Sequence, residues 1–292
     1  TPVFDNEGAF AIGVVELDPG NPNTVWVGTG EYNSQRSVGF GDGVYRSLDG
    51  GKSWKNMGLK DSGHISMIRI HPRDSETVWV AAQGPLWNSG GDRGLYRSRD
   101  GGESWAKILD IDPDTGVNEF VIDPENPDII VASSYQRRRH VWTLINGGPG
   151  SGIHKTTDGG ETWRRIDKGL PEGHMGRIGL AAAAASPGLI YAIVEAEEEE
   201  QGVYRSLDFG ESWEKRSDHM TASPQYYNEL FVDPSDADVL YAVDTFTHRS
   251  MDGGATWERI SIENRHVDDH ALWIDPENSD HLYIGGDGGV YE

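Results

Sequence analysis

Ser98-Arg-Asp-Gly-Gly-Glu-Ser-Trp105 is one of five versions of an eight-residue phrase that decides the fold of this chain. The other versions begin at Ser47, Thr156, Ser206 and Ser250, and all follow the pattern Ser/Thr-x-Asp-x-Gly-x-Ser/Thr-Trp. Their aspartates are Asp49, Asp100, Asp158, Asp208 and Asp252, so the spacing runs from 44 residues (252 − 208) to 58 residues (158 − 100). Self-similarity at such a period indicates a repeat architecture.

A second recurring element lies upstream of each Asp phrase. Its clearest copy is Asp18-Pro-Gly-Asn-Pro-Asn-Thr-Val-Trp-Val-Gly28, and five further copies begin at His71, Asp123, Ser186, Asp233 and Asp275. Each repeat therefore contains four short runs of β-branched and aromatic residues, separated by Gly, Pro, Asn and Asp. In the first repeat we predict strands at about 11–17, 24–29, 43–48 and 53–58. Four antiparallel strands per repeat are typical of a β-propeller blade.

The sequence thus predicts an all-β protein, a β-propeller of four-stranded antiparallel blades. We expect one propeller domain over residues 1–292 with six blades. Val290-Tyr-Glu292 begins a sixth copy of the third strand, whereas Thr1-Pro-Val-Phe4 resembles the residues that come after the Trp in other repeats. We therefore expect the N-terminal strand to close the sixth blade, which would remove open sheet edges. Because neither end looks like a natural terminus, we also expect a fragment of a longer protein, with further domains as partners.

Composition narrows the partners. The chain carries 48 acidic and 25 basic residues, a net charge of −23, which disfavours nucleic acid and anionic membranes. Without cysteine it has no disulfide, thiolate metal site or cysteine nucleophile. No apolar run reaches membrane-spanning length, so we predict no membrane insertion. We expect a secreted, periplasmic or cell-surface location, with which the lack of cysteine is compatible.

The residues of the Asp phrase have clear folding roles. The carboxylate can accept hydrogen bonds from backbone N–H groups of its own turn. The glycine two residues later suits a positive φ, and the tryptophan offers a large apolar face. We therefore predict that the five aspartates are structural and stand in the turn between the third and fourth strands.

The phrase resembles the Asp-box, or bacterial neuraminidase repeat. That repeat occurs in sialidases, xyloglucan-degrading enzymes and sortilin-type receptors. The stretches Gly30–Gly43 and Asn146–Gly152 look similar to large secreted bacterial proteins described as Asp-box glycosyl hydrolases or as sortilin-like. The resemblance implies the propeller fold, but it leaves function open, because function depends on a site rather than on a fold.

Candidate site residues come from the loops at the strand ends opposite the Asp phrases, since binding residues concentrate on such loops. In Arg137-Arg-Arg-His-Val-Trp142, the guanidinium groups suit carboxylates and Trp142 could stack on a sugar or peptide. An ion-pair network is the alternative for these arginines. The predicted ligand-binding residues are Arg36, Trp87, Arg137, Arg138, Arg139, His140, Trp142, Arg177, Tyr226, Tyr227, His266 and His270.

Two segments contain residue types that bind metal ions. His266-Val-Asp-Asp-His270 contains ligand types, but it lacks the His-Glu-x-x-His pattern and leads into a strand. Asp112-Pro-Asp114 offers oxygen ligands that calcium accepts, although its spacing falls short of an EF-hand loop. We predict no metal and no cofactor, with calcium as the alternative.

Two functions remain in view. The first is a secreted ligand-binding propeller for a glycan, peptide or protein. The alternative is a glycoside hydrolase that uses paired carboxylates, for which Glu31, Asp92, Asp268 and Asp269 are candidates. Tyr226-Tyr-Asn-Glu229 places a tyrosine near a glutamate, as sialidase chemistry needs, but the N-terminal Phe/Tyr-Arg-Ile-Pro signature of sialidases is missing. Enzymatic activity is therefore left open, and sialidase activity is not expected.

Overall fold

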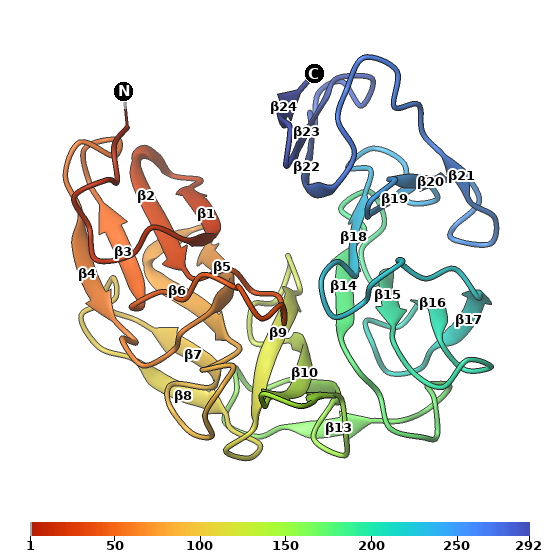
Figure 1. Ribbon diagram of the computed structural model, residues 1–292, viewed down its shortest axis with the longest axis horizontal. Coiled ribbons are helices and arrows are strands. Elements are labelled where there is room, and N and C mark those ends of the chain that lie inside the picture. Colours follow the sequence, from red (N-terminus) through yellow and green to blue (C-terminus); the bar gives the residue numbers. More distant parts are fainter. Residues whose placement is uncertain (1) are drawn as a thin grey trace. The chain divides into compact units, whose positions relative to one another are not determined.

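The computed structural model describes residues 2–292, and all of its regular elements are strands (Figure 1). The strands form six antiparallel sheets of the β-propeller blade type, which confirms the predicted fold class. By its contacts the chain divides into two compact units. The first unit holds residues up to Phe120, Ser134–Ser151 and Asp158–Trp163, and the second holds Val121–Ser133, Gly152–Thr157 and Arg164–Glu292.

Two complete blades lie in the first unit. The first sheet contains β1 (Ile12–Asp18), β2 (Asn21–Thr29), β3 (Val44–Ser47) and β4 (Lys55–Gly58), in that spatial order. The second contains β5 (Ile65–His71), β6 (Asp74–Ala82), β7 (Gly94–Ser98) and β8 (Ala106–Leu109). The four strands expected in the first repeat are therefore all present, each within a few residues of its predicted range.

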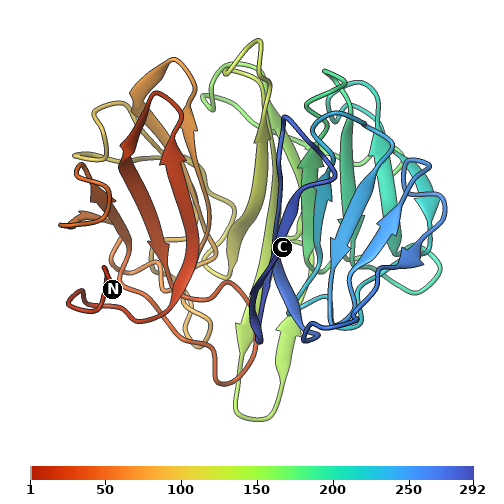
Figure 2. The same ribbon diagram turned by 90° about the horizontal axis from the view of Figure 1, so that it is seen from above.

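The third sheet has one strand more than a blade needs. Its strands are β9 (Thr115–Ile122), β10 (Ile130–Arg139), β11 (Leu144–Asn146), β12 (Gly152–Thr156) and β13 (Arg164–Ile166). The extra strand β11 pairs with the end of β10, where Arg138 lies opposite Ile145. Figure 2 shows this hairpin as a pair of yellow-green strands that project from the sheet.

The second unit contains the remaining sheets. They are β14 (Ile178–Ala182), β15 (Ile190–Val194), β16 (Gly202–Ser206) and β17 (Glu214–Ser217); β18 (Glu229–Val232), β19 (Leu240–Val243), β20 (His248–Ser250) and β21 (Glu258–Arg259); and β22 (Asp269–Ile274), β23 (Leu282–Gly286) and β24 (Gly289–Tyr291). The last sheet has three strands.

The expectation that the N-terminal strand closes the sixth blade is wrong for the residues that the structure describes. Residues 2–11 form no strand and pack on the first sheet instead. The indole Nε1 of Trp54 donates to the Val3 carbonyl at 2.7 Å, and the Phe4 ring meets the Trp54 and Tyr45 rings edge-on. The tryptophan of the first Asp phrase therefore holds this segment.

Each Asp phrase forms the turn between the third and fourth strands, as predicted. In the second sheet, Asp100 Oδ1 accepts the Ser104 N–H at 2.9 Å, and Asp100 Oδ2 accepts the Ser104 hydroxyl at 2.5 Å. The Ser98 hydroxyl donates to Asp100 Oδ1 and accepts the Gly102 N–H at 2.8 Å. These bonds, that from the Ser104 hydroxyl first, lower the pKa of Asp100 to about 2.

The glycine two residues after each aspartate has the predicted positive φ, which is +88° at Gly102. Close packing also requires glycine there, because a Cβ on Gly102 would lie 2.7 Å from the Trp26 ring. The preceding position tolerates a side chain, since Phe209 adopts a φ of +50° with its ring buried.

Cations of the first four sheets donate to the Asp turn of the next sheet. Three of them lie on a third strand, and Arg216 lies on β17, the fourth strand of its sheet. Arg46 donates to the Gly101 carbonyl at 2.6 Å, and Lys155 donates to the Phe209 carbonyl at 2.7 Å. Arg97 makes the equivalent bond to the Gly159 carbonyl. At the Gly253 carbonyl the donor is Arg216, at 2.9 Å. Each of these acceptors is the residue directly after a phrase aspartate.

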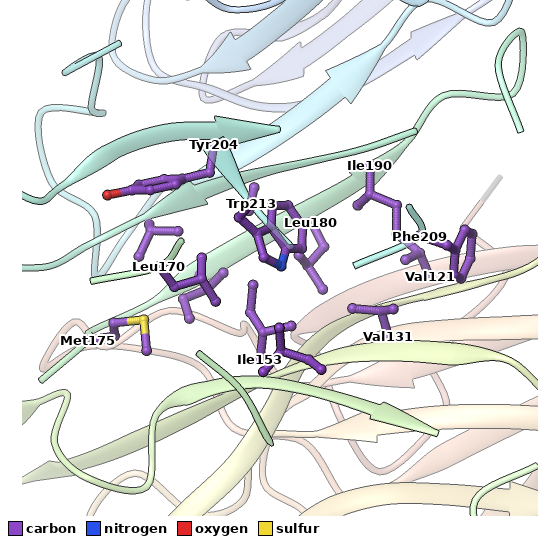
Figure 3. Packing of buried hydrophobic residues seen from close by; sticks show 14 residues of the cluster. Val121, Val131, Ile153, Leu170, Met175, Leu180, Ile190, Tyr204, Phe209 and Trp213 are labelled. Atoms are coloured by element: carbon purple, nitrogen blue, oxygen red, sulfur yellow. The ribbon is translucent and has the colours of Figure 1, made fainter. Parts of the chain in front are cut away.

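Apolar side chains between neighbouring sheets complete the core. In the second unit, Trp213 packs with Leu180, Ile153, Ile190 and further residues of the same cluster (Figure 3). In the first unit, the Trp105 ring meets the buried Trp26 ring edge-on at 6.3 Å, and its Nε1 donates to Met57. Trp105 and Trp213 thus lie between sheets, as their large apolar faces require.

Candidate functional site

A cavity of about 700 Å³ opens in the first unit, at the strand ends away from the Asp turns. Three segments line it: the loop between β2 and β3, the connection from β4 to β5, and the loop between β6 and β7. Segments of this kind are the ones in which the sequence analysis places the binding residues. The volume of the cavity falls within the range of small-molecule sites.

Two aromatic rings line the cavity while remaining open to solvent. Phe40 is 71% exposed and Trp87 is 40% exposed. Large apolar side chains left in contact with water inside a concavity mark a place where a ligand can cover them. Flat rings with accessible faces suit the apolar faces of sugar rings.

Polar groups surround these rings. Arg36, Lys60 and Asp61 line the cavity together with Asn88. The Arg36 guanidinium donates to the Val141 carbonyl at 3.1 Å, and the Asp61 N–H donates to Asp92 Oδ2 at 3.0 Å. Such groups can donate to and accept from the hydroxyl groups of a ligand.

His64 forms a neutral part of the cavity wall. It is almost completely buried, and its pKa is lowered to about 3, first by burial and then by the charge of Arg137. The imidazole therefore stays uncharged at neutral pH.

A buried arginine shapes the loop that carries Trp87. Arg93 donates to the carbonyls of Gly90, Gln83, Asn88 and Pro85, all within its own loop. Burial lowers its pKa to about 10, so it stays protonated. Because a guanidinium has five donors in a fixed geometry, one side chain can fix the whole loop.

The three consecutive arginines belong to strand β10 rather than to a loop. Alternation along the strand separates them. Arg137 is fully buried and donates to the carbonyls of Asn33, at 2.7 Å, and Gly84, at 3.2 Å. Arg139 donates twice to the Ser34 carbonyl, whereas Arg138 forms an ion pair with Asp114 at 3.6 Å. These contacts favour a role in holding loops, and ligand binding by these arginines stays a prediction.

The tip of the β10–β11 hairpin is exposed. Trp142 is 81% exposed, and its ring stacks on the His140 ring with a centroid distance of 5.4 Å. Of the predicted binding residues in the first unit, Arg36, Trp87 and Trp142 are exposed, Arg138, Arg139 and His140 are half-buried, and Arg137 is buried. Of the two carboxylate candidates in this unit, Glu31 is exposed beside Asn33, and Asp92 holds the Asp61 backbone.

In the second unit, three predicted residues form an aromatic cluster. The Tyr227 ring stacks on the His270 ring at 5.5 Å, and the Tyr226 ring meets both of these rings edge-on. The Tyr227 hydroxyl donates to Asp268 Oδ1 at 2.8 Å, and burial raises its pKa. His270 in turn contacts Asp287 at 3.0 Å.

The carboxylates near this cluster differ in environment. Asp269 is buried in an ion pair with Arg265 at 2.6 Å and also accepts the Thr247 hydroxyl, which favours a structural role. Asp244, which the sequence pattern did not single out, is nearly buried, and burial raises its pKa, with a contribution from Asp268. A carboxyl group with a raised pKa beside a second carboxylate is an arrangement that general acid catalysis uses.

The other predicted residues of the second unit have protein partners. Arg177 is buried and contacts Glu229 at 3.2 Å and the Tyr226 carbonyl at 3.0 Å. The His266 N–H donates to the Tyr291 hydroxyl at 3.1 Å. Both residues therefore help to hold their loops, and ligand binding by either stays a prediction.

Metal ligands are not gathered anywhere in residues 2–292, because no group of three or more His, Asp or Glu side chains there is arranged to hold an ion. The Asp112 carboxylate accepts from the Asp114 N–H and the Thr115 hydroxyl within its own turn. The same part of the chain contains no helix that could cross a membrane.

Comparison with known proteins places this architecture in a family. The model of the Sortilin-Vps10 family, described as sortilin, neurotensin receptor 3, matches residues 42–202. The chain belongs to this family. Xyloglucanase Xgh74A of Acetivibrio thermocellus is 24% identical over 304 residues, which cover 88% of this chain and 33% of that enzyme. A xyloglucanase of Paenibacillus sp is 26% identical and is matched over 88% of this chain and 27% of the enzyme.

A solved structure supports the same fold for this member of the Sortilin-Vps10 family. The crystal structure of an ancestral GH74 enzyme matches 98% of the chain and 36% of that protein, with a TM-score of 0.69 and 18% identity. At that identity the likeness concerns the fold alone. The chain spans about a third of the length of the curated relatives it matches.

Proposed function

We propose that this chain is the glycan-binding part of an extracellular protein that acts on xyloglucan-like polysaccharides. The observation that carries the proposal is the cavity of the first unit, where the accessible rings of Phe40 and Trp87 lie among hydrogen-bonding side chains. The named xyloglucanases support a glycan rather than a peptide as the ligand class.

The lining explains how a sugar chain would bind. Stacking of a sugar on Phe40 and Trp87 removes apolar surface from water. Each of these side chains loses little conformational entropy on binding, because it has only two side-chain torsions. Arg36, Lys60 and Asp61 then select orientation through hydroxyl contacts. Arg93 and Arg137 keep the two ring-bearing loops in place, so the cavity is formed before the ligand arrives.

The test is calorimetric titration of the chain with xyloglucan oligosaccharides, using Trp87→Ala and Phe40→Ala. Each variant should weaken binding by about tenfold or more, because an aromatic anchor typically contributes over 1 kcal/mol. Trp273→Ala, an exposed tryptophan of the second unit, is the matched control and should bind normally. Equal binding by all variants would refute the cavity as the glycan site.

Hydrolysis is a second candidate function, favoured by the raised pKa of Asp244 beside Asp268 and by the names of the relatives. In this scheme Asp244 would supply a proton to the leaving oxygen, while Asp268 would serve as base or nucleophile. A reducing-sugar assay on xyloglucan with Asp244→Asn and Asp268→Asn tests it. Activity that survives both substitutions would remove this pair from the reaction.

A further inference from the structure

The β10–β11 hairpin is an addition to the blade plan. The other sheets connect their second and third strands through loops, whereas β10 continues to Arg139 and turns back through β11. The turn is closed by paired backbone bonds between His140 and Thr143. A strand that the blade does not need, and that carries an exposed tryptophan, requires an explanation beyond folding.

The hairpin is firmly held against the two loops that line the cavity. The guanidinium of Arg139 donates two hydrogen bonds to the Ser34 carbonyl, at 2.9 and 2.7 Å. Its backbone N–H donates to the Leu86 carbonyl at 2.8 Å, next to Trp87. Arg137 links Asn33 and Gly84 beneath it. These contacts to two different loops fix the position of the hairpin relative to the cavity.

The tip of the hairpin nevertheless leaves apolar surface in water. Trp142 and Val141 are 81% and 73% exposed. The His140 ring lies nearly parallel to the Trp142 ring, with an angle of 14° between their planes, and supports one of its faces. The indole therefore has a preferred orientation with its other face accessible, as a stacking platform needs.

Arg36 connects this platform to the cavity. Its side chain lines the cavity and also donates to the carbonyl of Val141, which lies between His140 and Trp142 in the sequence. Leu86 is likewise both a lining residue and the acceptor for the hairpin backbone. Arg36 and the buried Leu86 thus each contact both the cavity and the hairpin.

We propose that the hairpin tip, formed by His140, Val141 and Trp142, is a second glycan subsite that binds the sugar chain where it leaves the cavity. The inference rests on the proposed function, because it assigns the same ligand to a longer surface. A polymer that contacts both places gains from the second contact without a second loss of translational freedom, so chain length becomes the determinant of affinity. The occupant is a polysaccharide rather than a protein because Arg36, which contacts the hairpin tip, also lines the cavity that we propose as the glycan site.

The test compares a short xyloglucan oligosaccharide with the intact polysaccharide, titrated into the full chain and its Trp142→Ala variant. The substitution should weaken binding of the polysaccharide by about tenfold and leave the short ligand unchanged, since a lost aromatic contact affects only ligands long enough to reach it. Trp273→Ala is again the matched control. Because Trp142 is exposed, the variant should fold normally, which an unchanged circular-dichroism melt verifies.

Other outcomes separate the two proposals. If the wild-type chain binds both ligands and Trp142→Ala changes neither, the second subsite is refuted and the cavity proposal stands. If the short ligand is weakened as much as the polymer, Trp142 belongs to the cavity itself and the extension is refuted. If the wild-type chain binds neither ligand, the proposed function is refuted, and the second subsite is refuted with it. A protein partner whose binding needs Trp142 while polysaccharide binding does not would also overturn the inference.

Discussion

The two ends of each third strand follow different rules of construction. At one end, the Asp turn satisfies itself: Asp100 accepts from Ser104 and Ser98, all within seven residues of sequence. At the other end, the loops are held by side chains from distant sequence, as Arg137 holds Asn33. The bonds of the Asp turn, and the cation contacts to it, recur with the phrase, whereas the contacts of Arg137 occur at one place. The repeated end therefore favours a structural role, and the individual end is where recognition can differ from blade to blade.

The largest effect should come from the repeated end. Trp105→Ala removes a ring that packs on Trp26 and a hydrogen bond to Met57, so it should lower the free energy of unfolding by about 3–5 kcal/mol. Urea denaturation measures it. Trp142→Ala is the comparison variant from the other end and should be nearly neutral. If the two substitutions cost the same, the distinction between the two ends would be lost.

The next effect concerns the side chains that hold the loop end. Arg137→Met keeps much of the buried volume but leaves the Asn33 and Gly84 carbonyls without these donors, so unfolding should become easier by about 2–3 kcal/mol. Glycan binding should weaken as well, because the loop moves. A variant that loses stability but binds normally would show that Arg137 supports the fold without positioning the cavity.

Mild acid should loosen the loop end first. The folded-state pKa of His64 is about 3, compared with an ordinary value of 6.5, because burial disfavours its charged form. The unfolded chain therefore binds a proton below pH 6.5 that the folded chain does not, and stability falls from there towards pH 3. Urea denaturation from pH 7 to pH 4 should show a shallower decline in His64→Gln. An unaltered decline would assign the loss to other buried histidines such as His154, whose pKa burial lowers to about 4.

The Asp turns should respond only at lower pH. Their bonds, that from the Ser104 hydroxyl first, lower the folded pKa of Asp100 to about 2 from 3.8. The stability that this carboxylate contributes is present above pH 3.8 and is lost as pH falls towards 2. Asp100→Asn should therefore flatten the stability curve between pH 4 and pH 2 and leave the range above pH 4 parallel to the wild type. The same denaturation series tests it, and parallel curves over the whole range would contradict the assignment.

The smallest effect is expected at Arg138. Its ion pair with Asp114 is partly exposed, with 3.6 Å between the charged atoms, so Arg138→Ala should change stability by less than about 1 kcal/mol. Thermal melting in low and high salt is the measurement. A loss comparable to that of Arg137→Met would mean that strand alternation does not separate the roles of these neighbours.

The same contrast explains how much could be predicted from sequence. The turn at Asp100 and the glycine at 102 follow from short-range chemistry, so their geometry could be derived before any coordinates. In the sequence, arginines 137 to 139 form one basic cluster. Their different roles follow from the observation that β10 extends as far as Arg139, so that all three lie on a strand. In that strand, the side chains of Arg137 and Arg139 point one way and that of Arg138 the other.

The cavity residues that sequence analysis missed had no periodic signal. Phe40 stands in a glycine-rich loop, and Lys60 follows a strand end, so only their meeting in space gives them meaning. An exposed aromatic residue between glycines, as in Gly39-Phe40-Gly41, was the one available hint. Asp244 likewise has no signal in the sequence, because its raised pKa results from burial in the folded chain.

The cations of β3, β7 and β12, which donate to the Asp turn of the next sheet, have a consequence for how repeats could be added by duplication. The first three sheets each carry a donor for the next sheet, and the second and third also carry an acceptor for the sheet before, as Arg97 and Gly101 do in the second sheet. A gene segment that encodes one whole repeat could therefore be copied in tandem, and the duplicate would find a matching contact on either side without any new substitution. A duplicated repeat would already contain the residues that contact the repeats before and after it.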